Sequence, residues 1–272
     1  MADKFLANRT AMVTGGASGM GLAIASALAS AGARVAIGSL LAGGKLADGE
    51  LSYLPGQEQM DQALSQLGPE TLGMNLDVTS DESVDDFHRA IVERLGPVDI
   101  LVNAAGITAE QTIVGHDDRL WNRVIDVNLN GTYRAIKRVL PSMIERKWGR
   151  IVNLASTAAS VGAATSGAYC ASKAGVVGLT RAVALEGAAH GVTCNSISPT
   201  WVDTSFGRAW MTDIAEGEHR TGDDYVSEVE KSNPQGRLIS PTEIGALALF
   251  LCSDGAKGIT MEDLRVSAGS LW

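Results

Sequence analysis

The fold is decided by the stretch "TAMVTGGASGMGLAIASALASAG", residues 10–32. A short apolar run is followed at once by a glycine-rich turn and then by a segment with helical periodicity. Gly15, Gly19 and Gly21 have the spacing TGxxxGxG, which lets a strand turn sharply into a helix and lets the backbone approach a pyrophosphate. Glycine turns also end strands in other proteins, but the strand and helix that flank this one favour a dinucleotide-binding turn.

Apolar runs and helical segments continue to alternate along the rest of the chain. The further apolar runs lie at 33–38, within 70–78, and at 98–106, 149–156, 192–198 and 263–267, and the helical segments lie at 59–68, 80–96, 117–130, 131–147, 167–190 and 241–253. The apolar runs are continuous, which indicates strands buried on both faces of a parallel sheet. We therefore predict an α/β fold, a single doubly wound Rossmann-type domain over residues 1–272, with a seven-stranded, mostly parallel sheet and helices on both faces. Residues 40–58 and 200–240 are predicted to be loop-rich.

Composition argues against several classes of function. The formal net charge of −9 argues against a general nucleic-acid binder, because contacts to phosphates need clustered Lys and Arg. No apolar run approaches the roughly 18 residues that span a bilayer, so we expect no membrane association. The three cysteines and four histidines have no metal-ligand spacing, so we expect no metal site. Sparse cysteines, and a first strand that leaves no room for a targeting segment, predict a cytoplasmic protein.

The choice between NAD and NADP depends on the end of the second strand. An acidic residue there often binds the ribose hydroxyls of NAD. Here Ser39 and then Leu40 occupy that position. The missing carboxylate removes repulsion against a 2′-phosphate, and Lys45 in the following loop is either a partner for that phosphate or a solvated loop residue. The sequence leaves NAD and NADP open, with a lean toward NADP.

A tyrosine and a lysine stand four residues apart in "SGAYCASKAG", residues 166–175. Tyr169 and Lys173 share one face of the predicted helix, and their small neighbours leave room for a cavity beside them. A nearby ammonium favours the phenolate and lowers the pKa of a tyrosine from about 10, as a general acid/base at neutral pH needs. Such pairs are also common on solvated helices, so the pair alone leaves its function open.

The motifs together closely resemble the short-chain dehydrogenases/reductases, from Thr10 to about Gly269. The chain departs from the family pattern at Ala104, which replaces an asparagine, and at Thr200, which replaces a glycine. The resemblance is carried by the TGxxxGxG turn, "NAAG" (103–106), "LDVTS" (76–80), "DVNLNG" (126–131), Ser156 thirteen residues before Tyr169, the YxxxK pair and "SPTWVDTS" (198–205).

The resemblance implies a catalytic set of Asn128, Ser156, Tyr169 and Lys173. Tyr169 is then the general acid/base, and Ser156 hydrogen-bonds the substrate oxygen. Asn128 positions a water that leads from Lys173 to solvent, and Lys173 also holds the nicotinamide ribose. Taken singly, Ser156 and Asn128 are better explained as a strand-end hydroxyl and a helix cap. The implied cofactor-binding residues are Gly15, Ser18, Gly19, Met20, Gly21, Ser39, Asp77, Val78, Asn103, Ala104, Gly106, Tyr169, Lys173, Pro199, Val202 and Thr204.

The substrate pocket is expected after Ser156, around Tyr169 and under a lid over about 200–235. We expect the substrate-binding residues to be Ser156, Tyr169, Trp201, Phe206 and Trp210. The aromatic residues are equally consistent with the core of a short helix pair. Arg208 either recognises an acidic group or is solvated.

These features predict an NAD(P)-dependent oxidoreductase, an alcohol dehydrogenase or carbonyl reductase that interconverts a small-molecule secondary alcohol and a ketone by hydride transfer. One alternative is a 3-oxoacyl-thioester reductase, which the lack of a basic patch for a carrier protein makes weaker. Another is a non-catalytic dinucleotide-binding regulatory protein, which would not need the complete Ser156, Tyr169 and Lys173 set. The resemblance also implies a homotetramer, in which we expect Trp272 to be buried at a subunit contact.

Overall fold

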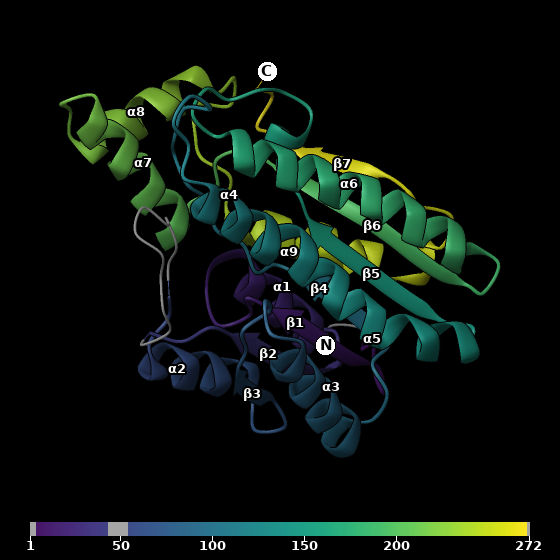
Figure 1. The fold of residues 1–272 in the computed structure, drawn as a ribbon. Coiled ribbons are helices and arrows are strands. Elements are labelled where there is room, and N and C mark those ends of the chain that lie inside the picture. Colours follow the sequence, from purple (N-terminus) through teal and green to yellow (C-terminus); the bar gives the residue numbers. More distant parts are fainter. Residues whose placement is uncertain (1–3, 43–53, 271–272) are drawn as a thin grey trace.

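The computed structural model describes residues 4–42 and 54–270. Across these ranges seven strands form one sheet in the order β3-β2-β1-β4-β5-β6-β7, and every neighbouring pair is parallel (Figure 1). The predicted α/β fold with a parallel sheet is therefore confirmed. The strands are β1 (Thr10–Thr14), β2 (Arg34–Ser39), β3 (Leu72–Asn75), β4 (Ile100–Asn103), β5 (Gly149–Leu154), β6 (Val192–Pro199) and β7 (Asp263–Val266).

Helices cover both faces of the sheet, and each face has its own hydrophobic core (Figure 1). Ile24, Met60 and Ile244 belong to one core, and Phe87 and Ile136 belong to the other. This division confirms the doubly wound arrangement. The first face carries α1 (Gly19–Ser30), α2 (Gln57–Leu67) and α9 (Pro241–Leu251), and the second carries α3 (Asp81–Leu95), α4 (Asp118–Ile125), α5 (Gly131–Glu145) and α6 (Gly167–Ala188).

The central strand explains why the apolar runs are continuous. Met12 of β1 packs into one core, whereas its neighbours Ala11 and Val13 pack into the other, because successive side chains of a strand point to opposite faces. The chain leaves β1 toward β2 on one side and returns to β4 on the other. A crevice at the carboxyl ends of the strands is expected where the strand order reverses in this way.

The prediction of a loop-rich segment over 200–240 is wrong. This segment contains α7 (Ser205–Gly217) and α8 (Gly222–Ser232), which lie together at one end of the molecule (Figure 1). Thr204 and Thr221 cap them, because each threonine hydroxyl accepts a hydrogen bond from the backbone N–H three residues on. The two helices share a small core of Met211, Val229 and Leu238.

The two helical stretches predicted over 117–147 follow each other without a break in helical structure. A π-helical turn at Asp126–Asn130 joins α4 to α5, and such turns are frequent at functional sites.

The predictions for Lys45 and Trp272 fall outside the described residues. In the part of the chain that the structure describes, no helix is long and apolar enough to cross a bilayer, and no three His, Cys, Asp or Glu side chains are grouped to hold a metal ion.

Candidate active site

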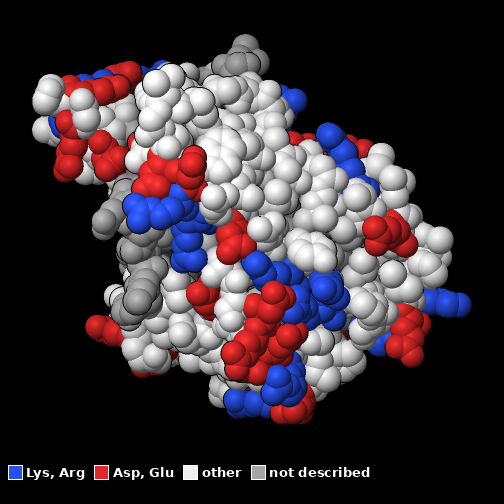
Figure 2. Space-filling view, viewed as in Figure 1, with Lys and Arg blue, Asp and Glu red and all other residues white. Residues whose placement is uncertain are grey.

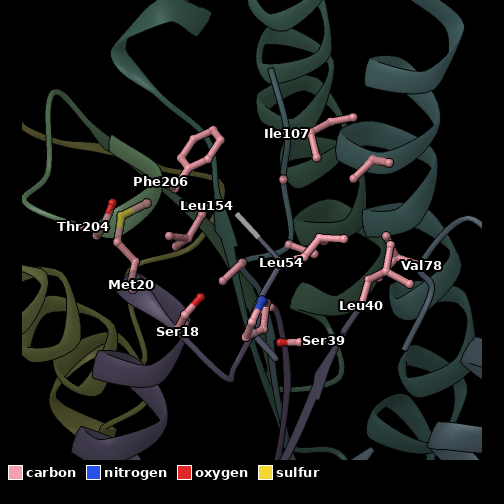
Figure 3. Close-up of a pocket in the computed structure, with 18 of the residues that line it drawn as sticks. Ser18, Met20, Ser39, Leu40, Leu54, Val78, Ile107, Leu154, Thr204 and Phe206 are labelled. Atoms are coloured by element: carbon pink, nitrogen blue, oxygen red, sulfur yellow. The ribbon is translucent and has the colours of Figure 1, made fainter. Parts of the chain in front are cut away.

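A cavity of about 150 Å³ opens at the carboxyl ends of β1 and β4, where the sheet order predicts a crevice. In Figure 3, Ser18 and Met20 at the start of α1 lie on one side of it, and Leu40 and Val78 lie on the other. Most of the predicted cofactor-binding residues line this cavity, which we call the first cavity. They are Gly15, Ser18, Gly19, Met20, Gly21, Ser39, Asp77, Val78, Ala104, Gly106, Tyr169, Lys173 and Thr204.

The glycine turn has no room for side chains. A Cβ on Gly21 would lie 2.1 Å from the carbonyl oxygen of Gly15. Gly15 itself has a φ of +66°, and a Cβ there would lie 2.7 Å from the amide nitrogen of Ala105. The start of α1, with its partial positive charge, therefore faces the cavity directly, and the Ser18 side chain makes no capping bond that would close it off. This cradle fits the diphosphate of a dinucleotide.

At the end of β2, Ser39 stands where an acidic residue often binds the ribose of NAD, and the carboxylate nearby in the lining is that of Asp77. The Ser39 hydroxyl accepts a hydrogen bond of 3.1 Å from the amide of Ala17, so it also braces the glycine turn. The Asp77 carboxylate accepts from the amide and the hydroxyl of Thr79, at 2.9 and 2.7 Å. Arg123 of α4 also lines the cavity and donates to the Thr79 hydroxyl at 3.2 Å. No motif spacing marks Arg123, so the sequence could not indicate it.

A second cavity, of about 420 Å³, meets the first at Tyr169. Every predicted substrate-binding residue lines it, and Pro199 and Val202, predicted to bind the cofactor, line it too. Ser156 lines only the second cavity and Lys173 only the first, so Tyr169 stands between them. The other residues common to the two cavities are Met20, Ala155, Thr204 and Phe206.

Three of the four catalytic candidates lie around this junction, one just after β5 and two on α6. Ser156 follows β5, accepts a hydrogen bond of 3.2 Å from the amide of Ala158, and is close enough to Tyr169 to lower the pKa of its hydroxyl. Lys173, one helical turn beyond Tyr169, donates to the carbonyl of Leu154 at 2.8 Å. Its Nζ lies 5.6 Å from the centre of the Tyr169 ring. The tyrosine–lysine pair is therefore buried at the site, not solvated.

Asn128 lies in the π-helical turn and lines neither cavity. Its amide accepts from the Ile107 N–H at 2.9 Å and donates to the Ile107 carbonyl at 2.9 Å and to Ser172 at 3.0 Å. A Cβ on Gly106 would lie 3.4 Å from both Asn128 Oδ1 and Lys173 Nζ. The missing side chain of Gly106 keeps open the space between these two atoms.

Asn103, predicted to bind the cofactor, lies beneath the site. Its amide donates to Asn153 of the neighbouring strand β5 at 2.8 Å, and it lines neither cavity. Asn153 in turn donates to Thr180 of α6 at 2.9 Å. The structure therefore gives Asn103 a bracing position between β4, β5 and α6, because its side chain points into the sheet and not out of its end.

Burial shifts the pKa values of Tyr169 and Lys173 in opposite directions. Burial raises the pKa of Tyr169 to about 12, and the hydrogen bond with Ser156 only partly opposes this. Burial lowers the pKa of Lys173 to about 8. The expected lowering of the Tyr169 pKa is not met, because burial of the phenol is the largest effect on it. At neutral pH the tyrosine hydroxyl holds its proton and the lysine is mostly charged.

An aromatic cluster and a carboxylate complete the second cavity. The ring centre of Trp210 lies 5.1 Å from that of Tyr169 and 5.0 Å from that of Trp201. Glu110, in the loop after β4, also lines the cavity, and its carboxylate accepts from the Trp210 indole at 2.9 Å. The sequence does not indicate Glu110, because no motif contains it and its partner is 100 residues away.

Comparison with known proteins connects this geometry to a family. A family model described as enoyl-(acyl carrier protein) reductase matches residues 15–270. The chain is 37% identical over 264 residues to the 3-oxoacyl-(acyl-carrier-protein) reductase FabG of Vibrio cholerae, with 97% of this chain and 98% of the relative covered. It is 34% identical over 262 residues to a D-beta-hydroxybutyrate dehydrogenase of Rhizobium meliloti, with 96% and 98% covered.

A solved structure agrees with these matches. A single-substitution variant of actinorhodin polyketide ketoreductase, determined with NADPH, superimposes with a TM-score of 0.88 at 34% identity, with 99% of this chain and 98% of that chain covered. The chain is a short-chain dehydrogenase/reductase. As a short-chain dehydrogenase/reductase it is an oxidoreductase, and the family uses NAD(P)H.

Burial of the Lys173 ammonium is expected to lower the stability of the folded protein. Its pKa falls from 10.5 to about 8 on folding, which corresponds to about 3 kcal/mol. Lys173→Met removes this penalty and also one hydrogen bond, worth about 1 kcal/mol. We expect the free energy of unfolding at pH 7 to rise by about 1–3 kcal/mol in urea denaturation.

The pH dependence of the free energy of unfolding tests whether the buried charge of Lys173 is the cause. Because the folded-state pKa is the lower one, the unfolded wild-type chain binds more protons between pH 8 and 10.5, and wild-type stability rises with pH across that window. The advantage of the variant should therefore be complete below pH 8 and shrink toward pH 10.5. A variant that is no more stable than the wild type at pH 7 would contradict the prediction.

Proposed function

We propose that this short-chain dehydrogenase/reductase is an NAD(P)-dependent reductase that interconverts a ketone and a secondary alcohol. The observation that carries the proposal is the position of Tyr169, which stands where the two cavities meet, with Ser156 on the wall of the second cavity and Lys173 on the wall of the first. A group there can reach a reacting oxygen in the second cavity while the first cavity holds a dinucleotide. A purely regulatory dinucleotide-binding protein would have no use for this junction.

When bound, the dinucleotide supplies or accepts a hydride. The Tyr169 hydroxyl, which burial keeps protonated, gives its proton to the ketone oxygen during reduction. The Ser156 hydroxyl donates a hydrogen bond to the same oxygen and stabilises the charge that develops on it. The ammonium of Lys173 stabilises the phenolate that remains. The open space beside Gly106 supports a water between Asn128 Oδ1 and Lys173 Nζ, which would return a proton to the site.

The segment over about 200–235 is proposed as the substrate lid. Trp201, Phe206 and Trp210 line the second cavity from this segment, which supports direct contact with the substrate. Trp201 also packs against the small core of the α7–α8 pair. An aromatic residue of this segment can therefore line the substrate cavity and also belong to the core of a short helix pair. Arg208 pairs with Asp203 at 2.6 Å and lines neither cavity, which favours its solvated alternative.

A 3-oxoacyl-thioester reductase is the second candidate, because the FabG relatives carry that activity in their names and the family description also names a carrier-protein substrate. An acidic carrier protein would need a basic docking surface. On the face shown in Figure 2, basic and acidic side chains are intermixed. Arg138 of α5, for example, pairs with Asp81 and Asp85. Reduction of a free ketone but not of the matching thioester would separate the two candidates in favour of the first.

The role of Tyr169 is tested by Tyr169→Phe. Loss of the proton donor should lower kcat/KM for a ketone by about 10²–10⁴-fold, while the cofactor Kd stays nearly unchanged because the ring is retained. Tyr133→Phe, at an exposed tyrosine of α5, is the matched control and should keep wild-type activity. Retention of activity in Tyr169→Phe would exclude the proposed mechanism.

NADP is the proposed cofactor, supported by Ser39 at the end of β2 and by the NADPH in the ketoreductase structure. Titration followed by nicotinamide fluorescence should give a lower Kd for NADPH than for NADH. Ser39→Asp, which can still accept from Ala17, should shift the ratio at least about tenfold toward NADH, which corresponds to about 1.4 kcal/mol of repulsion against the 2′-phosphate. Ser39→Asn is the control, because asparagine has the size of aspartate without its charge. Tighter binding of NADH by the wild type would reverse the assignment.

We also propose that the chain forms a homotetramer, as the family resemblance implies. Large apolar side chains exposed on α6 and α9 support an assembly that covers them; they include Leu185 and Phe250. Sedimentation equilibrium of the full chain should give four times its 28.3 kDa mass. A monomer at micromolar concentration would contradict the proposal.

A further inference from the structure

Glu110 is held in the wall of the second cavity by neutral partners. Its carboxylate accepts hydrogen bonds from Trp210 Nε1 at 2.9 Å, from the Ser166 hydroxyl at 2.7 Å and from the Thr165 hydroxyl at 2.5 Å. These donors come from α7 and from the loop before α6, so Glu110 joins three parts of the cavity wall. Because none of the donors carries a charge, they fix the carboxylate in place without neutralising it.

No cation lines the second cavity among the residues that the structure describes. Glu218, the other acidic residue of the lining, is exposed and pairs with Arg220 at 3.1 Å. Lys173 lines only the first cavity, where it donates to a backbone carbonyl. Glu110, which is half-buried, is thus the negative charge that a bound substrate would meet.

The other groups offered to a substrate are apolar or neutral. The hydroxyl of Ser156 lies on the cavity wall, as does Thr200, which stands where the family pattern has a glycine. Thr200 Oγ1 is buried and has no hydrogen-bond partner among the described residues. Aromatic rings of Trp201, Phe206 and Trp210 supply much of the remaining surface. Such a lining suits a substrate with an apolar body and uncharged polar groups.

We propose that Glu110 sets the charge selectivity of this cavity, so that the enzyme takes electrically neutral ketones and alcohols and rejects those that carry a carboxylate. The inference deepens the proposed function and rests on it, because it names the substrate class for the same site. Two negative charges that face each other across a largely apolar cavity repel more strongly than they do in bulk water. An anionic substrate would also lose its hydration without gaining a cationic partner.

The test uses two aryl ketones of the same shape, 4-acetylbenzamide and 4-acetylbenzoate, which differ in charge. Their Kd values are measured with saturating NADP⁺ by the quenching of tryptophan fluorescence, since Trp201 and Trp210 line the cavity. Their kcat/KM values are measured separately with NADPH. We expect the wild type to bind the amide at least about tenfold more tightly than the carboxylate, a difference of about 1.4 kcal/mol.

Glu110→Gln isolates the charge, because glutamine keeps an acceptor oxygen for the Trp210 indole. We expect this variant to bring the two Kd values to within about threefold of each other, mainly by tightening the carboxylate, which corresponds to less than about 0.7 kcal/mol. Glu216→Gln, at an exposed residue of α7 outside the cavity lining, removes the same charge and should keep the wild-type ratio.

The outcomes separate this inference from the proposed function. Equal Kd values in the wild type, failure of the amide to bind, or an unchanged ratio in Glu110→Gln would each overturn the role of Glu110. The wild-type ratio requires no variant, so it remains decisive even when Glu110→Gln does not fold. Selective binding of the amide without turnover would count against the proposed reduction and still support charge selectivity. Turnover of both ketones with equal kcat/KM and Kd values would support the proposed reduction and overturn the charge selectivity.

Discussion

A Cβ on Gly21 would lie 2.1 Å from the carbonyl oxygen of Gly15, so the turn between β1 and α1 tolerates no side chain at that point. This close contact brings the start of α1 to the carboxyl end of the sheet, beside the ends of β1 and β4. The first cavity exists because Gly15 and Gly21 place no side chains at this turn. The residues that line it from β4 and α6 are useful only because this turn is already in place.

The same site is expected to cost the fold stability, because it buries the ammonium of Lys173. Tyr169 and Lys173 are both buried, and the shifts of their pKa values show how strongly the interior resists their charged forms. A hydrocarbon side chain would pack at less cost, yet it would leave no proton donor at the junction of the two cavities. The neighbouring small residues of α6 keep room for these two side chains.

Glu110 gives the second cavity its shape as well as its charge. Through Trp210 it fixes α7, and Trp210 in turn packs edge-on against Tyr169. The proton donor and the proposed lid are therefore linked through one indole ring. A change in the proposed lid is expected to move the ring that packs on Tyr169.

The sequence by itself determined the parallel sheet, the glycine turn and the Tyr169–Lys173 face, because each depends on local periodicity or on short fixed spacing. It did not determine α7 and α8, whose start depends on threonine caps and whose burial depends on a core formed only when they pack together. Tertiary structure alone decided that Asn103 points into the sheet and that Glu110 meets Trp210. Both depend on side-chain direction and on contacts between distant segments, which no local pattern in a single sequence encodes.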